Sequence, residues 1–173
     1  MTVLNLHPQH RLARRIHPSS GIVAGELLHE IAAGLAPWAS SVHETVPGDP
    51  TQRRFARLLE TPAYEAWLIV WPQATRLDLH DHGDSSGVLH VVSGELLEAF
   101  TDRDQPGPLR VQRLAPGDSV TVGPTRVHDV WNPTAETAVT VHVYSPPLST
   151  MTFYEDRPGH RLEAVRTEHS TAP

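Results

Sequence analysis

TRLDLHDHGDSSG, residues 75–87, combines a strand pattern with two closely spaced histidines. Polar and apolar residues alternate in it, so Asp78, His80 and His82 share one face of a predicted strand. Two imidazoles placed two residues apart on a strand can point at one metal ion. An H-x-H pair also occurs on exposed polar strand faces, so the pair alone indicates a metal site only weakly.

The residues around this stretch predict a protein built mainly of strands. Short runs rich in Val, Leu, Thr and aromatic residues alternate with turns that contain Gly or Pro. Strands at this spacing favour an all-β barrel or sandwich. The predicted strands are YEAWLIVW (64–71), TRLDLHDH (75–82), VLHVVSGELLEAF (88–100), LRVQRLA (109–115), DSVTVG (118–123), VHDVWN (127–132) and TAVTVHVYS (137–145).

The N-terminal part of the chain predicts helical structure. SGIVAGELLHEIAAGLAPW, residues 20–38, has apolar residues at helical spacing, and Pro37 is predicted to end the helix. TQRRFARLLE, residues 51–60, predicts a short helix or a turn that leads into a strand. Residues 1–20 show no clear period and are expected to drape over the body. We therefore expect a helical segment, 1–60, packed on a barrel, 61–173, in a single domain.

The composition excludes several kinds of protein. The chain has 173 residues and a formal net charge of −6, and its 14 basic residues, all arginines, form no cluster large enough to suggest nucleic acid. It has no cysteine, so any metal must be held by histidines and carboxylates. It has no apolar run of signal or membrane-helix length. We expect a cytoplasmic protein with no nucleic-acid or membrane partner.

A second histidine motif follows downstream. PGDSVTVGPTRVHDVWN, residues 116–132, places two turns and a strand ahead of His128, with Asn132 four residues later. Together with the H-x-H pair and its downstream Gly94, it resembles the two motifs of the cupin superfamily, over residues 64–145. The resemblance implies an all-β, jelly-roll-like cupin barrel with an N-terminal helical segment. It also implies three metal ligands that converge inside the barrel: His80, His82 and His128.

The usual carboxylate ligand of a cupin is absent. In the common pattern a Glu follows the second His by four or five residues, where this chain has Ser86 and Gly87. Asp84 lies an even number of residues from His80 and His82 and could compete for the place of the missing ligand, but it follows Gly83 in a predicted turn. The sequence therefore favours three neutral imidazoles that leave three metal positions open, which suits an anionic substrate and dioxygen on Fe(II). His90 is expected on the barrel surface.

Four segments together resemble the cysteine dioxygenase family: HDHGDSSG (80–87), VHDVWN (127–132), VHVYSPP (141–147) and FAR (55–57). The resemblance implies a non-haem dioxygenase with one Fe(II) per chain that converts L-cysteine and O2 to cysteine sulfinic acid. The catalytic Ser-His-Tyr relay of the family corresponds to Thr140, His142 and Tyr144, with Thr in place of Ser. The resemblance also implies a cis bond between Ser145 and Pro146.

The same resemblance assigns the substrate-binding residues. The arginine that clamps the substrate carboxylate in the family corresponds to Arg57, with Arg53 and Arg54 as close rivals and Phe55 in place of a family Tyr. A small amino-acid carboxylate needs a planar, permanently charged donor. The other residues expected at the pocket are Tyr144, Met151 and Trp71.

Mammalian members of the family link a cysteine to the active-site tyrosine. The corresponding position here is Gly87, and without any cysteine the link cannot form. The chain therefore resembles the bacterial type, in which the tyrosine, here Tyr144, works unmodified.

Other functions fit parts of the same pattern. A dioxygenase for another thiol acid, such as 3-mercaptopropionate, would use the same metal site, although relatives of that kind tend to carry Gln in place of the arginine. A non-catalytic cupin that binds a small molecule, or an isomerase or hydrolase with another metal, would keep the barrel. We expect a small thiol and O2 as partners, and a monomer or a weak dimer.

Overall fold

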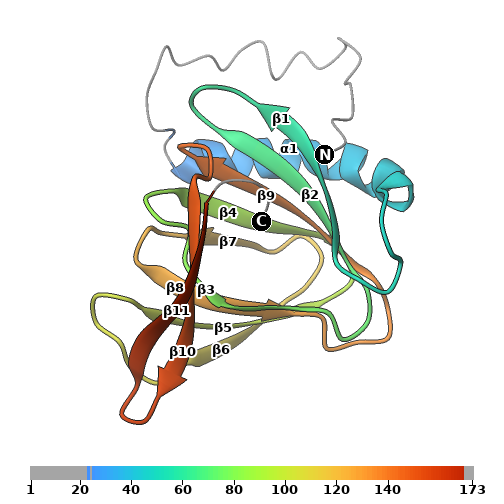
Figure 1. The fold of residues 1–173 in the computed structure, drawn as a ribbon. Helices are drawn as coiled ribbons and strands as arrows, with labels where there is room; N and C mark the ends of the chain where they lie inside the picture. The colour runs from blue at the N-terminus through green and yellow to red at the C-terminus, as the bar shows by residue number, and fades with distance from the viewer. Residues whose placement is uncertain (1–22, 24, 170–173) are drawn as a thin grey trace.

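The computed structural model describes residue 23 and residues 25–169, so the prediction that residues 1–20 drape over the body lies outside the described part. One helix and a 3-10 turn precede a series of strands (Figure 1). The elements are α1 (Gly25–Val42), η1 (His43–Thr45), β1 (Arg54–Glu60), β2 (Glu65–Trp71), β3 (Arg76–His80), β4 (Ser86–Ser93), β5 (Leu96–Asp102), β6 (Arg110–Leu114), β7 (Ser119–Val122), β8 (Arg126–Trp131), β9 (Ala138–Ser145), β10 (Thr150–Arg157) and β11 (Arg161–His169).

Two antiparallel sheets form the barrel. The five-stranded sheet has the order β1-β2-β9-β4-β7, and the six-stranded sheet has the order β11-β10-β3-β8-β5-β6. Helix α1 crosses the outer face of the five-stranded sheet, where it packs on β4 and β9 (Figure 1). The expectation of an all-β barrel with an N-terminal helix is confirmed.

Each face of the five-stranded sheet has its own core. On the outer face, Leu28 of α1 belongs to a cluster with Leu68 of β2. On the inner face, Trp71 of β2 belongs to a second cluster with Leu89 of β4. Strand β2 is buried along its whole length, because the helix covers one face and the barrel interior the other. This explains why its sequence from Ala66 to Trp71 is a continuous apolar run instead of an alternating one.

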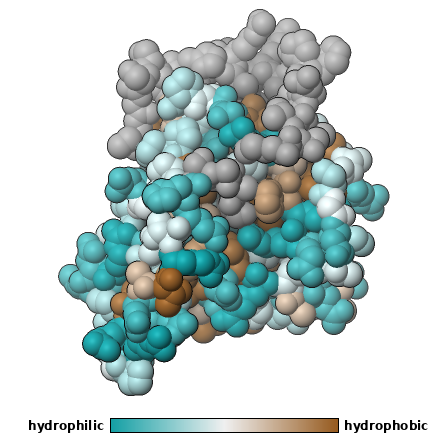
Figure 2. All heavy atoms as spheres, in the orientation of Figure 1, coloured by the Kyte–Doolittle hydropathy of each residue, from teal (hydrophilic) through white to brown (hydrophobic). Residues whose placement is uncertain are grey.

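The polar residues of the strands lie mostly on the outside of the molecule. On the face that Figure 2 shows, the surface of the described residues is largely hydrophilic, with small hydrophobic patches. None of the described helices combines the length and the apolar content that crossing a bilayer requires.

The strands expected between residues 64 and 145 are all present, and the longest run divides into two. The chain reverses at Gly94, whose φ is +72°. A Cβ at that position would lie 2.5 Å from the Cα of Ala138, so the turn needs both the backbone freedom and the small size of glycine. The run 88–100 therefore becomes β4 and β5.

The prediction that Pro37 ends the helix is wrong, because α1 continues to Val42. Proline removes one hydrogen bond inside a helix. The turn that follows buries Ala39 completely and packs Trp38 and Val42 against the outer core. We attribute the continuation of the helix to this burial of apolar surface.

The segment 51–60 forms no helix. Its residues from Arg54 onward form β1, which pairs with β2 at the edge of the five-stranded sheet. Ala56 and Leu58 face the outer core, which leaves Phe55 and Arg57 on the opposite face. The C-terminal strands β10 and β11 were also not predicted. Strand β11 is exposed along almost its whole length, and its charged residues do not alternate with apolar ones.

Candidate metal centre and active site

The three predicted ligand histidines meet inside the barrel. His80 ends β3, His82 lies in the turn after it, and His128 lies directly across from His80 on β8. All three are buried, and their ligand nitrogens lie within 4.8 Å of one another. The Nε2 atoms of His80 and His82 are 3.2 Å apart. The antiparallel pairing of β3 with β8 thus brings the two sequence motifs to one point.

The hydrogen bonds of the rings leave metal-binding nitrogens available. His80 donates from Nδ1 to the carbonyl oxygen of Asp78 at 2.7 Å, which makes its Nε2 the acceptor nitrogen. His128 donates from Nδ1 to Oε1 of Glu98 at 2.7 Å, and its Nε2 is buried without a partner among the described residues. A buried, unpaired ring nitrogen beside two others is the arrangement that a metal ion satisfies.

The charge state of the rings also fits a metal. Burial lowers the pKa values of His80 and His82 well below their usual value, and the neighbouring His128 adds to the effect. These rings are therefore neutral near pH 7 and can offer lone pairs. Imidazole suits iron, zinc, copper and nickel, so the residues present fit a single Fe(II).

Asp81 fixes the turn between the two neighbouring ligands. It lies on the other side of the chain from the histidines, as its parity predicts, and is almost fully buried. Its Oδ2 accepts hydrogen bonds from Arg103 at 2.6 Å and from the hydroxyl of Tyr154 at 2.7 Å. An acidic residue between two predicted ligand histidines suggests an anchoring role, but the sequence does not reveal which residues it binds.

Within the described chain, no carboxylate joins the three histidines. Asp84 is exposed, and Ser86 is only partly buried. Gly87 lies against Tyr144, because a Cβ there would be 2.8 Å from Cδ1 and 3.0 Å from Cε1 of that ring. The position that the resemblance pairs with the tyrosine is thus in direct contact with it.

The acid that contacts the centre is Glu98, which the sequence analysis did not single out. Burial opposes its ionisation, but hydrogen bonds from His128 and Arg126 outweigh this and lower the pKa of Glu98 to about 2. Its inward position follows from the pairing of β5 with β8, which no local sequence pattern reveals.

Tyr144 and His142 come from β9 of the opposite sheet. The Tyr144 hydroxyl lies 3.0 Å from Nδ1 of His142 and 3.5 Å from Nε2 of His82. Burial raises the pKa of Tyr144, partly offset by the charge of Arg53. Burial, reinforced by His128 and Arg53, lowers the pKa of His142 to about 3. Both side chains are therefore neutral near pH 7.

Thr140 does not bond to His142. Its hydroxyl accepts a hydrogen bond of 2.9 Å from Nε1 of Trp71, while Nε2 of His142 has no partner among the described residues. The rings of Trp71 and His142 are stacked, with centroids 6.3 Å apart. The expected link from Thr140 to His142 is replaced by a link to Trp71, which in turn packs on His142.

The three candidate arginines have different surroundings. Arg57 pairs with Glu60 at 2.9 Å and lies 3.6 Å from Glu65. Arg54 donates to the carbonyl oxygen of Val46 at 2.6 Å, on the side of the loop before β1.

Arg53 is the arginine that faces the centre. Its guanidinium lies 5.0 Å from the centre of the Trp71 ring, and its Nη1 is buried without a partner among the described residues. Burial lowers the pKa of Arg53 to about 10, so it remains charged. Its charge acts on His142 and Tyr144, as described above. The geometry therefore favours Arg53 over Arg57 as the residue with an unpaired donor nitrogen at the site.

The remaining predicted positions are placed as follows. Met151 is buried in the inner core on β10. Ser145–Pro146 is a cis peptide bond, as expected. His90 lies on the outer face of β4, away from the three ligands, but is only 8% exposed, with Nδ1 2.7 Å from the hydroxyl of Ser119. His90 therefore lies on the outer face of the barrel, as expected, but it is covered there instead of exposed to solvent.

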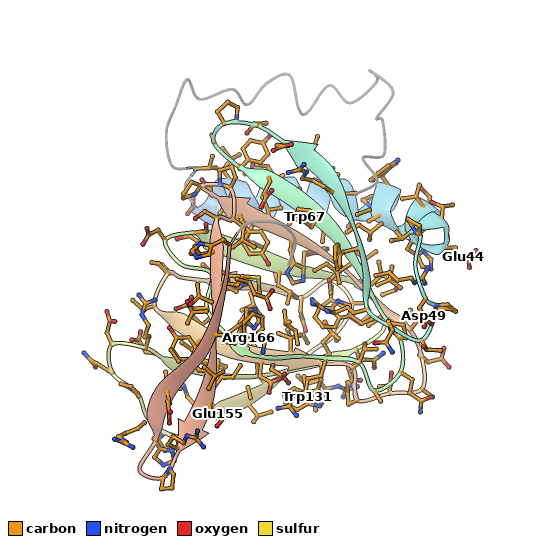
Figure 3. The ribbon with its side chains drawn as sticks, in the orientation of Figure 1. Glu44, Asp49, Trp67, Trp131, Glu155 and Arg166 are labelled. Carbon is orange, nitrogen blue, oxygen red and sulfur yellow. The ribbon has the colours of Figure 1, made fainter. Side chains whose placement is uncertain are left out.

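Figure 3 shows side chains from both sheets filling the interior of the barrel, with Trp67 labelled on β2 and Arg166 on β11. Arg166 lies over the ring of Phe153, 3.5 Å from its centre, and Phe153 packs against His80. The edge strand β11 thus covers a residue that packs against His80.

Comparison with known proteins agrees with this geometry. The sequence model of the family described as cysteine dioxygenase type I matches residues 48–157 of the chain. A relative from Rattus norvegicus named "Cysteine dioxygenase type 1" is 30% identical over 118 residues. The match covers 62% of this chain and 57% of the relative, little more than half of the relative's length. A relative of the same name from Bos taurus is 26% identical over 174 residues, 92% of this chain and 86% of that protein.

The fold also has solved counterparts. A protein of Klebsiella pneumoniae with a double-stranded β-helix domain is similar with a TM-score of 0.50 at 19% identity, over 72% of this chain and 94% of that one. This similarity concerns the fold alone, and it agrees with the cupin barrel expected from the sequence.

Proposed function

Because the chain belongs to the cysteine dioxygenase type I family, we propose that it is a non-haem Fe(II) thiol dioxygenase that converts L-cysteine and O2 to cysteine sulfinic acid. The observation that carries the proposal is the group of three buried imidazoles with no carboxylate among them, across the barrel from a buried, unpaired arginine nitrogen. Such a site offers open metal positions and a separate place for an anion.

His80, His82 and His128 would hold one Fe(II) per chain. Iron bound there supplies three open coordination positions, a lowered pKa for a coordinated thiol, and the redox chemistry by which O2 oxidises sulfur. The neutral state of His80 and His82, which follows from their lowered pKa values, leaves the positive charge of the metal uncompensated by these two ligands. That charge favours an anionic thiolate.

The carboxylate of the substrate would bind to Arg53. The buried Nη1 of Arg53 lacks an acceptor, which a carboxylate can provide, and a planar donor suits a carboxylate. Arg57 already has Glu60 and Glu65 as partners, so a carboxylate would have to compete with them. We therefore assign the anchoring role to Arg53, which the sequence analysis kept as a rival.

Tyr144 would donate a hydrogen bond to the bound substrate. Its raised pKa keeps the hydroxyl protonated, and the nearby Nδ1 of His142 orients it. Thr140 would act on the other side, by fixing Trp71 beneath the Arg53 guanidinium. In this arrangement the residues of β2 and β9 orient the substrate. Trp71 and Met151 exclude water around it.

L-cysteine is favoured over another thiol acid by membership of the family. A dioxygenase of 3-mercaptopropionate would use the same metal site, since that molecule also carries a thiol and a carboxylate. A cytoplasmic location and a monomeric or weakly dimeric state stay predictions.

The test is oxygen uptake by the iron-loaded protein with L-cysteine and 3-mercaptopropionate in parallel, together with the mass of the product. Uptake with cysteine and a gain of two oxygen atoms supports the proposal. Uptake only with 3-mercaptopropionate would keep the chemistry and change the substrate. Uptake with neither thiol, although iron is bound, would contradict the proposed reaction.

A further inference from the structure

Glu98 is a fully buried carboxylate at the centre of a hydrogen-bond network. Its Oε1 accepts from Nδ1 of His128 at 2.7 Å and from Nε of Arg126 at 3.0 Å. Its Oε2 accepts from Nη2 of Arg126 at 2.7 Å and from Nε2 of Gln112 at 2.5 Å. The donors come from the two strands on either side of β5, so the carboxylate is fixed from both sides.

The contacts of Glu98 indicate that its side chain is ionised. All four partners are N–H groups, and only an ionised carboxylate can accept from every one of them. Arg126 is itself held, with its guanidinium 3.6 Å from the centre of the Phe100 ring. A buried ion pair is seldom more stable than apolar residues of the same volume. Stability alone therefore does not account for Glu98.

Because of Glu98, the three predicted ligand histidines differ in the hydrogen-bond partners of their outer nitrogens. Nδ1 of His80 donates to a neutral backbone carbonyl, and Nδ1 of His82 has no partner among the described residues. Of the three, His128 is the one whose outer nitrogen bonds to a charged acceptor within the described chain. A carboxylate on the outer nitrogen makes an imidazole a stronger electron donor to a metal and fixes its tautomer.

We propose that Glu98 is a positioning residue of the metal centre, which points Nε2 of His128 at the iron and supplies the negative charge that the three-histidine ligand set lacks. The inference rests on the part of the proposed function that assigns His128 to the metal. Because Glu98 acts through the ring, it adds this charge without occupying a coordination position. The positions needed for a thiol and O2 stay open.

The test compares Glu98→Gln with Glu95→Gln. Both changes replace a carboxylate by an amide in the β4–β5 hairpin region. Glu95 pairs with Arg113, and among the described residues no hydrogen bond links this pair to the three histidines. Affinity for Fe(II) is measured without oxygen by competition with a chromogenic chelator. We expect Glu98→Gln to bind Fe(II) about 10- to 100-fold more weakly, and Glu95→Gln to match the wild type. Wild-type affinity in folded Glu98→Gln would overturn the proposal.

A second comparison separates positioning from general stability. In the His128→Ala protein, adding Glu98→Gln should change Fe(II) affinity by less than about twofold, because the effect passes through the missing ring. A loss as large as that in the wild-type background would mean that Glu98 acts through the fold, which would overturn its positioning role.

The single change leaves Arg126 without its partner and can prevent folding. The double change Glu98→Gln/Arg126→Gln removes both charges and avoids an unpaired buried one. It should lose Fe(II) affinity to the same extent, and wild-type affinity in it would refute the proposal. A wild-type protein that binds no Fe(II) would overturn both this inference and the proposed function, whereas equal binding by wild type and Glu98→Gln would overturn the inference alone.

Discussion

The guanidinium of Arg53 lies 5.0 Å from the centre of the Trp71 ring and keeps one nitrogen buried and unpaired. The aromatic face stabilises the cation, and the indole itself is fixed by its hydrogen bond to Thr140. The pair therefore presents a charged, oriented donor toward the centre before any substrate binds.

Replacing Arg53 with Ala should lower kcat/KM for L-cysteine by about 10- to 100-fold, because a hydrogen bond to a charged group contributes roughly 1.5 to 3 kcal/mol. Cysteamine, which has the thiol and the amine but no carboxylate, should show almost no difference between the two proteins. The measurement is steady-state oxygen uptake with both thiols.

Arg57→Ala is the matched control for Arg53→Ala. Its guanidinium is engaged by Glu60 and Glu65, so its loss should change kcat/KM only a few-fold. A greater loss in Arg57→Ala than in Arg53→Ala would return the anchoring role to Arg57.

Tyr144→Phe should reduce kcat by about 10- to 100-fold while the purified protein retains its iron. The phenol hydroxyl lies near both His142 and His82 but is not needed to hold the metal. Turnover and iron content are measured on the same preparation. Tyr64→Phe removes a hydroxyl on the outer core and should retain normal turnover. Loss of iron from Tyr144→Phe would show that the residue maintains the metal centre.

Gly87→Ala should slow turnover and leave iron in place. The new Cβ would lie 2.8 Å from the Tyr144 ring and 3.2 Å from the carbonyl oxygen of Val143, so the ring must move. Overpacking of this kind typically costs about 1 to 3 kcal/mol. Gly123→Ala meets no atom within 4 Å and serves as the control in kinetic and thermal-unfolding measurements. Unchanged kinetics in Gly87→Ala would mean that the tyrosine position is not critical.

The metal-free protein should lose stability as the pH falls from about 6.5 toward 3. Burial lowers the pKa of His142 to about 3, whereas an imidazole in the unfolded chain titrates near 6.5. Between these values the unfolded chain binds more protons, so the free energy of unfolding rises with pH. His80 and His82 shift in the same direction.

Denaturant unfolding of the metal-free protein at a series of pH values measures this dependence. His142→Gln should flatten the slope, and His160→Gln, at the exposed turn between β10 and β11, should not. An equal slope in wild type and His142→Gln would mean that this ring does not contribute.

The cluster of three histidines could be predicted from the sequence. Strand parity places His80 and His82 on one face, and the resemblance of the second motif to the cupin pattern adds His128, which the structure brings to the same point. Arg53 could not be preferred over Arg57, because both lie on the same face of the chain and the difference arises from Glu60 and Glu65.

Glu98 was overlooked for a related reason. On β5, Leu96, Glu98 and Phe100 share one face, and a charged residue in such a strand is usually exposed. Only the pairing of β5 with β8 reveals that this face turns inward beside His128. Likewise, Thr140 could be placed on the correct face, but its partner Trp71 depends on the pairing of β2 with β9.

The two sheets contribute different parts of the centre. The three histidines come from β3, the turn after it and β8 of the six-stranded sheet, whereas Trp71, Thr140, His142 and Tyr144 lie on the five-stranded sheet. Under the proposed roles, one wall of the barrel retains the metal and the other selects the molecule that reaches it. Substitutions that alter substrate choice can therefore accumulate on one wall during evolution while the iron-binding wall is inherited intact.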